Sequence, residues 1–273
     1  NEFEGTVKLI FQPGEEKLPC GASAMITEGV LENPKVNTII GQHVYPQLAA
    51  GKVGFKGGMY MASTDELYVT VYGKGGHAAL INDYNNPLLI AAAILIELNK
   101  AFMEGVANEQ LPTVLAFGKI IGNGATNIIP NEVKIEGTFR TMNEVWRAAA
   151  HLKMKKIAED VALKMGGRCD FNIVKGYPFL VNDEATTTKA KLAAIDYLGK
   201  ENVVDLDIRM TAEDFSFYSQ VVPACFYRLG IKNDAKNINS GLHTSTFNID
   251  ESALETSIGL MAWIAINELK GTN

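Results

Sequence analysis

The chain has 273 residues and a formal net charge of -6 at pH 7; 47% of its residues are hydrophobic and 21% are charged. These values exclude a disordered or fibrous chain and indicate a globular protein with one large domain or two of ordinary size. Because no block of Lys and Arg stands out, we expect no surface for nucleic acid or for an anionic membrane. The longest apolar stretches, such as residues 88–96, are too short to span a bilayer.

The cysteines and the first residues bear on the cellular compartment. The three cysteines, Cys20, Cys169 and Cys225, are widely spaced and form no CxxC pair, so they indicate neither a disulfide framework nor a zinc knuckle. Residues 1–4 are acidic and polar, which argues against a signal peptide at this position. We therefore expect a cytoplasmic protein.

The first sixty residues alternate between strand-like and helix-like segments. The apolar run at residues 7–11 predicts a buried strand, which Pro13-Gly14 ends sharply. Residues 22–30 carry apolar side chains at helical spacing, and residues 38–44 predict a second apolar strand. Strand, helix and strand in this order indicate a parallel or mixed sheet covered by helices.

The pattern changes near residue 63. The predicted elements then follow as β-α-β-β-α-β, at residues 67–72, 88–98, 113–121, 133–141, 143–165 and 169–174. The long fifth element is expected to bury Val145, Leu152, Ile157, Val161 and Met165. This order predicts a complete split βαβ unit of the ferredoxin-like α+β type.

From about residue 180 the first pattern resumes. Residues 185–198 predict a helix, residues 225–229 a strand, and Asp250 is placed to cap a final helix. The sequence therefore predicts an α/β fold with one discontinuous domain, built from residues 1–62 and 176–273, and an inserted domain at residues 63–175.

Two adjacent carboxylates, Glu15 and Glu16, follow the first predicted strand. Neighbouring acids repel each other unless a cation or a proton separates them. The pair therefore suits a metal site in which one carboxylate binds the ion and the other moves protons. A solvated surface turn is the alternative interpretation.

Two of the four histidines strengthen the metal interpretation. His43 follows the second apolar strand, and His243 follows a glycine turn, so we expect both of them and Glu16 at the ends of elements of the discontinuous domain. Ligands of open α/β sheets bind at that edge. Carboxylate and imidazole groups suit Zn²⁺ or a similar divalent ion, although each histidine taken singly is also compatible with a structural role.

A glycine-rich segment offers a competing interpretation. Residues 73–78 fit the pattern G-x-G-x-x-A directly after a strand, which is the fingerprint of a dinucleotide-binding turn. That fingerprint requires a helix to begin at about Gly76, whereas residues 82–86 are polar and the helix is expected from Pro87. A glycine-rich loop or hairpin is therefore favoured.

Arg140 and the acidic pair Glu213-Asp214 each allow two interpretations. Arg140, in the inserted domain, suits a substrate carboxylate through paired hydrogen bonds, or is an ordinary surface residue. The acidic pair Glu213-Asp214 indicates either the first turn of a helix capped by Thr211 or a place near the site.

Seven segments, in order over nearly the whole chain, together resemble the M20 family of metallopeptidases. Within it they are most similar to the amidohydrolase branch of aminoacylase, hippurate hydrolase and indole-acetyl-amino-acid hydrolase type. The segments are residues 12–16, 41–44, 73–79, 127–130, 137–141, 210–215 and 242–243. The resemblance implies a mixed-sheet, zinc-peptidase-like catalytic domain with an inserted ferredoxin-like lid and dimerisation domain.

The same resemblance implies the chemistry and the roles of residues. The expected reaction is metal-dependent hydrolysis of the amide bond of N-acyl amino acids, or of short peptides in a peptidase or carboxypeptidase. Glu15 is the implied general base, and the implied ligands of one or two Zn, Mn, Co or Ni ions are Glu16, His43 and His243.

The inserted domain carries the remaining implied roles. His77 is expected to reach the active site of a partner subunit and to stabilise the oxyanion there. Asn127 and Arg140 are expected to contact the substrate, and the chain is expected to form a homodimer through the lid.

The sequence also departs from this branch. The branch has a Gly-Cys-Gly-His-Asp type motif upstream of the Glu-Glu pair, which supplies a Cys and a His ligand, and no such motif occurs in this chain. We therefore expect an incomplete catalytic domain, in a truncated, cleaved or frame-broken chain, with metal binding weakened or lost and with activity in doubt. A non-catalytic dimerisation or ligand-binding remnant of the same fold is the alternative.

Overall fold

The computed structural model describes residues 4–17, 21–104 and 112–270. The chain divides into two compact units: unit 1 comprises Asn1–Tyr60, Leu180–Arg209 and Glu213–Asn273, and unit 2 comprises Met61–Phe179 and Met210–Ala212. Both units mix helices with strands, as expected of an α/β chain. In the described part of the chain, none of the helices combines the length and apolar composition needed to cross a bilayer.

Unit 1 is built on a four-stranded mixed sheet with the order β1-β12-β2-β11. The strands are β1 (Ile39–Ala49), β12 (Ala224–Lys232), β2 (Val53–Phe55) and β11 (Val203–Asp205). β1 is parallel to β12 and β2 is parallel to β11, whereas β12 and β2 are antiparallel. The mixed sheet predicted from the sequence is thus confirmed.

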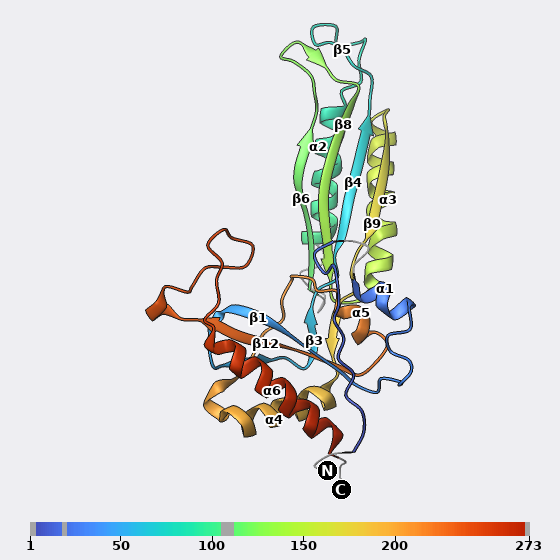
Figure 1. The fold of residues 1–273 in the computed structure, drawn as a ribbon. Helices are drawn as coiled ribbons and strands as arrows, with labels where there is room; N and C mark the ends of the chain where they lie inside the picture. The colour runs from blue at the N-terminus through green and yellow to red at the C-terminus, as the bar shows by residue number, and fades with distance from the viewer. Residues whose placement is uncertain (1–3, 18–20, 105–111, 271–273) are drawn as a thin grey trace. The chain divides into compact units, whose positions relative to one another are not determined.

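Two helices, α4 (Glu184–Leu198) and α6 (Ser252–Leu269), lie side by side and contact β12 (Figure 1). Eight of the nine residues of β12 are buried, because the strand has a neighbour on each edge and helices on one face. Asp183 begins α4 by accepting a hydrogen bond from the Thr186 amide at 2.8 Å. This packing fixes β1 and β12, which carry His43 and Arg228 as register partners.

Unit 1 also contains shorter elements. They are α1 (Gly21–Thr27), α5 (Ser216–Ser219), the 3₁₀ turns η2 (Lys200–Asn202) and η3 (Asp234–Lys236), and a separate two-stranded sheet of β3 (Gly58–Met61) and β10 (Leu180–Asn182).

Cys169 and Cys225 are free thiols, and Cys20 lies outside the described residues.

The buried strand predicted at residues 7–11 is wrong. Residues 4–12 belong to no strand, and Leu9 and Phe11 are 74% and 84% exposed. A strand exists only where a neighbour supplies the other half of its hydrogen-bond ladder. Within the described residues, β1 pairs only with β12, so the apolar run remains extended and solvated.

Unit 2 has a four-stranded antiparallel sheet with the order β6-β8-β4-β9. In chain order its main elements are β4 (Asp65–Tyr72), α2 (Pro87–Asn99), β6 (Thr113–Ile121), β8 (Glu132–Thr141), α3 (Glu144–Lys164) and β9 (Arg168–Lys175). α2 continues into the π-helical turn η1 (Lys100–Glu104). The two long helices lie against each other and against the sheet (Figure 1).

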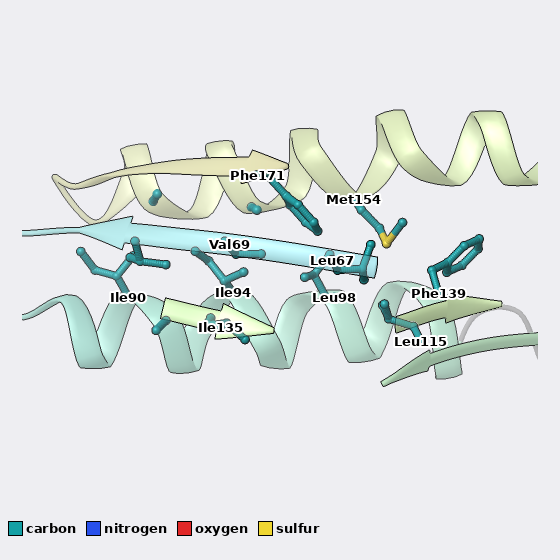
Figure 2. Close-up of a cluster of buried hydrophobic side chains, with 14 of the residues drawn as sticks. Leu67, Val69, Ile90, Ile94, Leu98, Leu115, Ile135, Phe139, Met154 and Phe171 are labelled. Carbon is teal, nitrogen blue, oxygen red and sulfur yellow. The ribbon is translucent and has the colours of Figure 1, made fainter. Parts of the chain in front are cut away.

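The core of unit 2 lies between these helices and the sheet. Leu67, Val69 and Val71 alternate along β4 and are at most 1% exposed, as expected of a strand with one buried face. Figure 2 shows Leu67 and Val69 beside Ile90, Ile94 and Leu98 of α2. The side chains of Asn86 and Asn143 accept from the Leu88 and Trp146 amides, so both helices begin at a cap.

The buried face predicted for α3 is only partly correct, because Ile157 and Val161 pack against the core of unit 2 but the other predicted residues do not. Val145 and Leu152 are 82% and 73% exposed, whereas Ala150, Ala158 and Ala162 are fully buried. Alanines let the helix axis approach the sheet closely, and larger apolar residues at these positions would hold it away.

Arg147 of α3 is also fully buried, within an ion network at the start of β4. Its guanidinium donates two hydrogen bonds to Asp65, at 2.6 and 3.0 Å, and further bonds to Glu144. It also donates to the backbone oxygens of Thr64 and Gly176, at 2.9 and 3.1 Å. One side chain thus joins the segment that enters β4 to the segment that leaves β9.

A short two-stranded sheet, β5 (Gly76–His77) with β7 (Ile128–Ile129), lies beyond the ends of the long strands in unit 2 (Figure 1). Gly76 begins no helix, and α2 starts only at Pro87. The dinucleotide-binding interpretation of residues 73–78 is therefore wrong, because its glycines do not open a helix.

Candidate metal centre

The Glu15-Glu16 pair lies in a tight turn of unit 1. Gly14 has φ of 65°, a left-handed conformation that favours glycine, and the Lys17 amide bonds to the Gly14 oxygen at 3.4 Å. The turn gives its two acids different surroundings: Glu15 is half-buried, whereas the Glu16 side chain is 75% exposed.

Three carboxylates converge beside this turn. Ligand atoms of Glu15, Glu213 and Asp214 all lie within 4.8 Å of one another, and Glu213 and Asp214 are 6% and 0% exposed. Burial, followed by the charges of Asp214 and Glu16, raises the pKa of Glu15. Burial and the Glu15 charge raise the pKa of Glu213 to about 7. Such a cluster is stabilised by a proton or a cation.

Asp214 accepts three hydrogen bonds from the chain around the turn. The Gln12 amide nitrogen lies 2.6 and 2.8 Å from its two oxygens, and the Ala22 backbone nitrogen lies 3.1 Å away. Thr211 does not cap α5, because the helix begins only at Ser216. The helix-capping interpretation of this acidic pair is thus wrong.

His43 lies inside β1 rather than at its end, because the strand continues to Ala49. Its Nδ1 is 2.8 Å from the Val44 oxygen. Since a carbonyl oxygen only accepts, Nδ1 carries the proton and Nε2 carries the lone pair that a metal would use. Burial and the Arg228 guanidinium lower the pKa of His43, and the Glu16 charge opposes them.

His243 lies in the loop between β12 and α6, in a left-handed backbone conformation with φ of 58°. Backbone strain of this kind at a non-glycine residue is often associated with function. Its Nε2 is 3.9 Å from Glu16 Oε1, and both side chains are largely exposed. Asp250 holds the base of this loop through hydrogen bonds from Asn233 and Lys236.

Unit 1 therefore contains Glu15, Glu16, His43 and His243, and it brings Glu16 next to His243. The sequence singled out Glu213-Asp214 without giving the pair a role, and the structure places it against Glu15. The roles predicted for the individual site residues stay predictions.

The other predicted site residues belong to unit 2. His77 and Asn127 lie together, because the Ala78 amide bonds to the Asn127 oxygen at 3.0 Å. The Ala79 amide donates to His77 Nδ1 at 3.2 Å, which assigns the ring proton of a neutral His77 to Nε2. Arg140 lies near the C-terminal end of β8, and its guanidinium donates a hydrogen bond to the Met210 oxygen. It lies eight residues beyond Glu132, roughly 26 Å along an extended strand.

Comparison with known proteins assigns a family. Residues 1–267 match the sequence model of peptidase family M20/M25/M40. IAA-amino acid hydrolase ILR1-like 4 of Arabidopsis thaliana is 35% identical, over 98% of this chain and 61% of that protein. N-acetylcysteine deacetylase of Bacillus subtilis (strain 168) is 32% identical, over 97% of this chain and 67% of that protein.

Solved structures agree. The Bacillus subtilis YxeP protein, described as a dinuclear metal-binding peptidase of the M20 family, superposes with a TM-score of 0.80 at 28% identity. That match covers 99% of this chain and 67% of the YxeP chain. The chain thus spans about three fifths to two thirds of the lengths of these relatives.

Proposed function

Because the chain belongs to the M20/M25/M40 peptidase family, we propose that it forms part of a metal-dependent amidohydrolase that removes the acyl group from N-acyl amino acids. The names of the two relatives describe hydrolysis of an amino-acid conjugate and removal of an N-acetyl group. The observation that carries the proposal is the 3.9 Å approach of Glu16 to His243 beside the Glu15, Glu213 and Asp214 carboxylates.

The proposed metal ligands are Glu16, His43 and His243. Carboxylate and imidazole donors suit Zn, Mn, Co or Ni, and the Nδ1 hydrogen bond of His43 orients its Nε2 for ligation. A divalent ion held there would lower the pKa of a bound water toward about 7 and would polarise the amide carbonyl. Glu15 is adjacent in sequence and half-buried, which is a suitable place for a base that takes the water proton and passes it to the leaving amine.

His77 is proposed to act in the active site of a second copy. Its neutral form presents Nε2–H, a donor suited to the oxyanion of the tetrahedral intermediate. Arg140, proposed with Asn127 to contact the substrate, lies near the other end of β8. One small substrate cannot touch both ends of one unit 2. Arg140 would therefore serve a different copy from the one that His77 and Asn127 serve.

Unit 2 offers a surface for that pairing, and its proposed role is that of an inserted lid and dimerisation domain. β6 is an edge strand of the sheet and contacts η1, the continuation of α2, and α2 exposes apolar side chains. Leu89 and Ile96 of α2 are 62% and 54% exposed, and Ile120 of β6 is 52% exposed. Two identical edges can pair about a two-fold axis and bury these side chains.

The test is hydrolysis of N-acetyl and N-benzoyl amino acids by the metal-loaded protein, with dipeptides and chelator as comparisons. We expect Glu15→Gln to lower kcat by roughly 10²- to 10⁴-fold while the metal stays bound. Glu159→Gln, on the exposed side of α3, is the matched control and should change nothing. Preference for dipeptides would favour a peptidase, and ligand binding without turnover would favour a non-catalytic remnant.

A further inference from the structure

Asp214 lies where the two chain segments that flank the Glu15-Glu16 turn are in contact. A Cβ on Gly21 would overlap the Pro13 oxygen, so these two backbones are in direct contact. Asp214 binds one group on each side of that contact: the Gln12 side chain before the turn and the Ala22 amide after it. Ala22 is in the first turn of α1, where amides have no partner within the helix.

The next residue connects Asp214 to the sheet. Phe215 packs on Phe226 of β12, with ring centroids 4.9 Å apart. It also fills the space above Gly41 of β1, where a Cβ would lie 2.7 Å from its ring. Gly41 and His43 are two residues apart in one strand, so their side-chain positions share a face. Phe215 therefore covers the face of β1 from which His43 projects.

We propose that Asp214 is the positioning residue that sets the Glu15-Glu16 turn against His43. The sheet fixes Phe215, Phe215 fixes Asp214, and the three hydrogen bonds of Asp214 fix the segments on both sides of the turn. A carboxylate is suited to this role, because two oxygens can accept the amide of Gln12 and the amide of Ala22 together. The effect on catalysis rests on the proposed function. The hydrogen bonds that Asp214 accepts from Gln12 and Ala22, called the clamp below, do not depend on it.

A reciprocal exchange tests the clamp. Asp214→Asn faces the Gln12 amide with a second amide, and Gln12→Glu faces Asp214 with a second carboxylate, so each single variant weakens the contact. In the double variant the amide introduced at position 214 donates to the carboxylate introduced at position 12, and its oxygen still accepts from Ala22. Interacting residues give non-additive effects in such a cycle, whereas independent ones add.

Two readouts are needed on the full chain. Amide hydrogen exchange at Ala22 reports the clamp without reference to metal. Titration with Co²⁺, followed by its visible absorption, reports the arrangement of the ligands. We expect faster exchange at Ala22 and a roughly 10- to 100-fold higher Kd for Co²⁺ in each single variant, with recovery to within about threefold in the double variant.

Asp183→Asn is the matched control, because it removes a carboxylate that caps α4 and asparagine caps equally well. It should leave both readouts unchanged. Additive losses in the double variant, or singles that change exchange at Ala22 but not Co²⁺ binding, would overturn the positioning role. If Asp214→Asn fails to fold, Gln12→Glu and the double variant still decide the matter. A wild-type chain that binds no Co²⁺ would count against Glu16, His43 and His243 as metal ligands in this chain, while amide exchange at Ala22 would still test the hydrogen bonds of Asp214.

Discussion

Replacing Arg147 with methionine should destabilise unit 2 more than any surface change. Arg147 and Asp65 are both fully buried, and the substitution leaves the Asp65 charge without its guanidinium partner. Breaking a buried pair from one side costs about 3–5 kcal/mol. For a unit of about 120 residues, with an unfolding entropy near 250 cal/mol/K, this corresponds to a fall in Tm of about 12–20 °C.

Calorimetry gives the Tm, and amide exchange in β4 and α3 assigns the change to unit 2. Arg168→Met is the matched control, because its partner Asp170 is 65% exposed and such surface pairs contribute about 0–1 kcal/mol. An Arg147→Met protein within about 1 kcal/mol of wild type would refute the reasoning. It would mean that His151, water or a proton compensates the Asp65 charge once the guanidinium is gone.

The pH dependence of this network has a definite sign. Burial raises the pKa of Asp65, but hydrogen bonds from His151 and Arg147 outweigh it and hold the pKa below the ordinary value of 3.8. The ionised carboxylate therefore contributes stability that is present above that ordinary value and lost as the pH falls through the folded-state pKa. Arg147→Met removes one of the lowering causes, so we expect its acid unfolding midpoint to move to higher pH.

Three further outcomes can be checked. Ile94→Ala, in the core of unit 2, should cost about 2–5 kcal/mol in urea unfolding, whereas Ile96→Ala on the exposed side of α2 should cost less than about 1 kcal/mol; equal costs would contradict the assigned helix face. Asp250→Ala should speed amide exchange across residues 233–250, and unchanged exchange would show that the loop is held elsewhere. Leu89→Lys should convert a dimer to a monomer in sedimentation equilibrium, and a dimer that persists would count against the α2 surface.

Helix positions in unit 2 could be predicted from the sequence because their signals are local. Pro87 and Asn143 mark the starts of α2 and α3, and the structure places both helices within a residue of the predicted bounds. The strand expected at residues 7–11 failed because a strand depends on a neighbour elsewhere in the chain. The predicted face of α3 was wrong at Leu152, because hydrophobicity favours a leucine there, whereas close packing selects Ala158.

In the candidate site, too, local patterns could be predicted from the sequence and contacts between distant residues could not. Glu15 and Glu16 stand out because two adjacent acids after Pro-Gly form a local pattern. The hydrogen bond between Gln12 and Asp214 joins residues 202 positions apart, and no spacing rule indicates such a contact. His151 is similar, since its partner Asp65 lies 86 residues away, on β4.

The extended stretch around Leu9 and Phe11 also bears on how the protein behaves at high concentration. Side chains 74% and 84% exposed, on a backbone outside any sheet, resemble the free edge to which a strand from another molecule adds. Exposed apolar segments outside a sheet promote irreversible aggregation as the protein concentration rises. This stretch, which lies outside both cores, is therefore one place from which copies of the chain can associate.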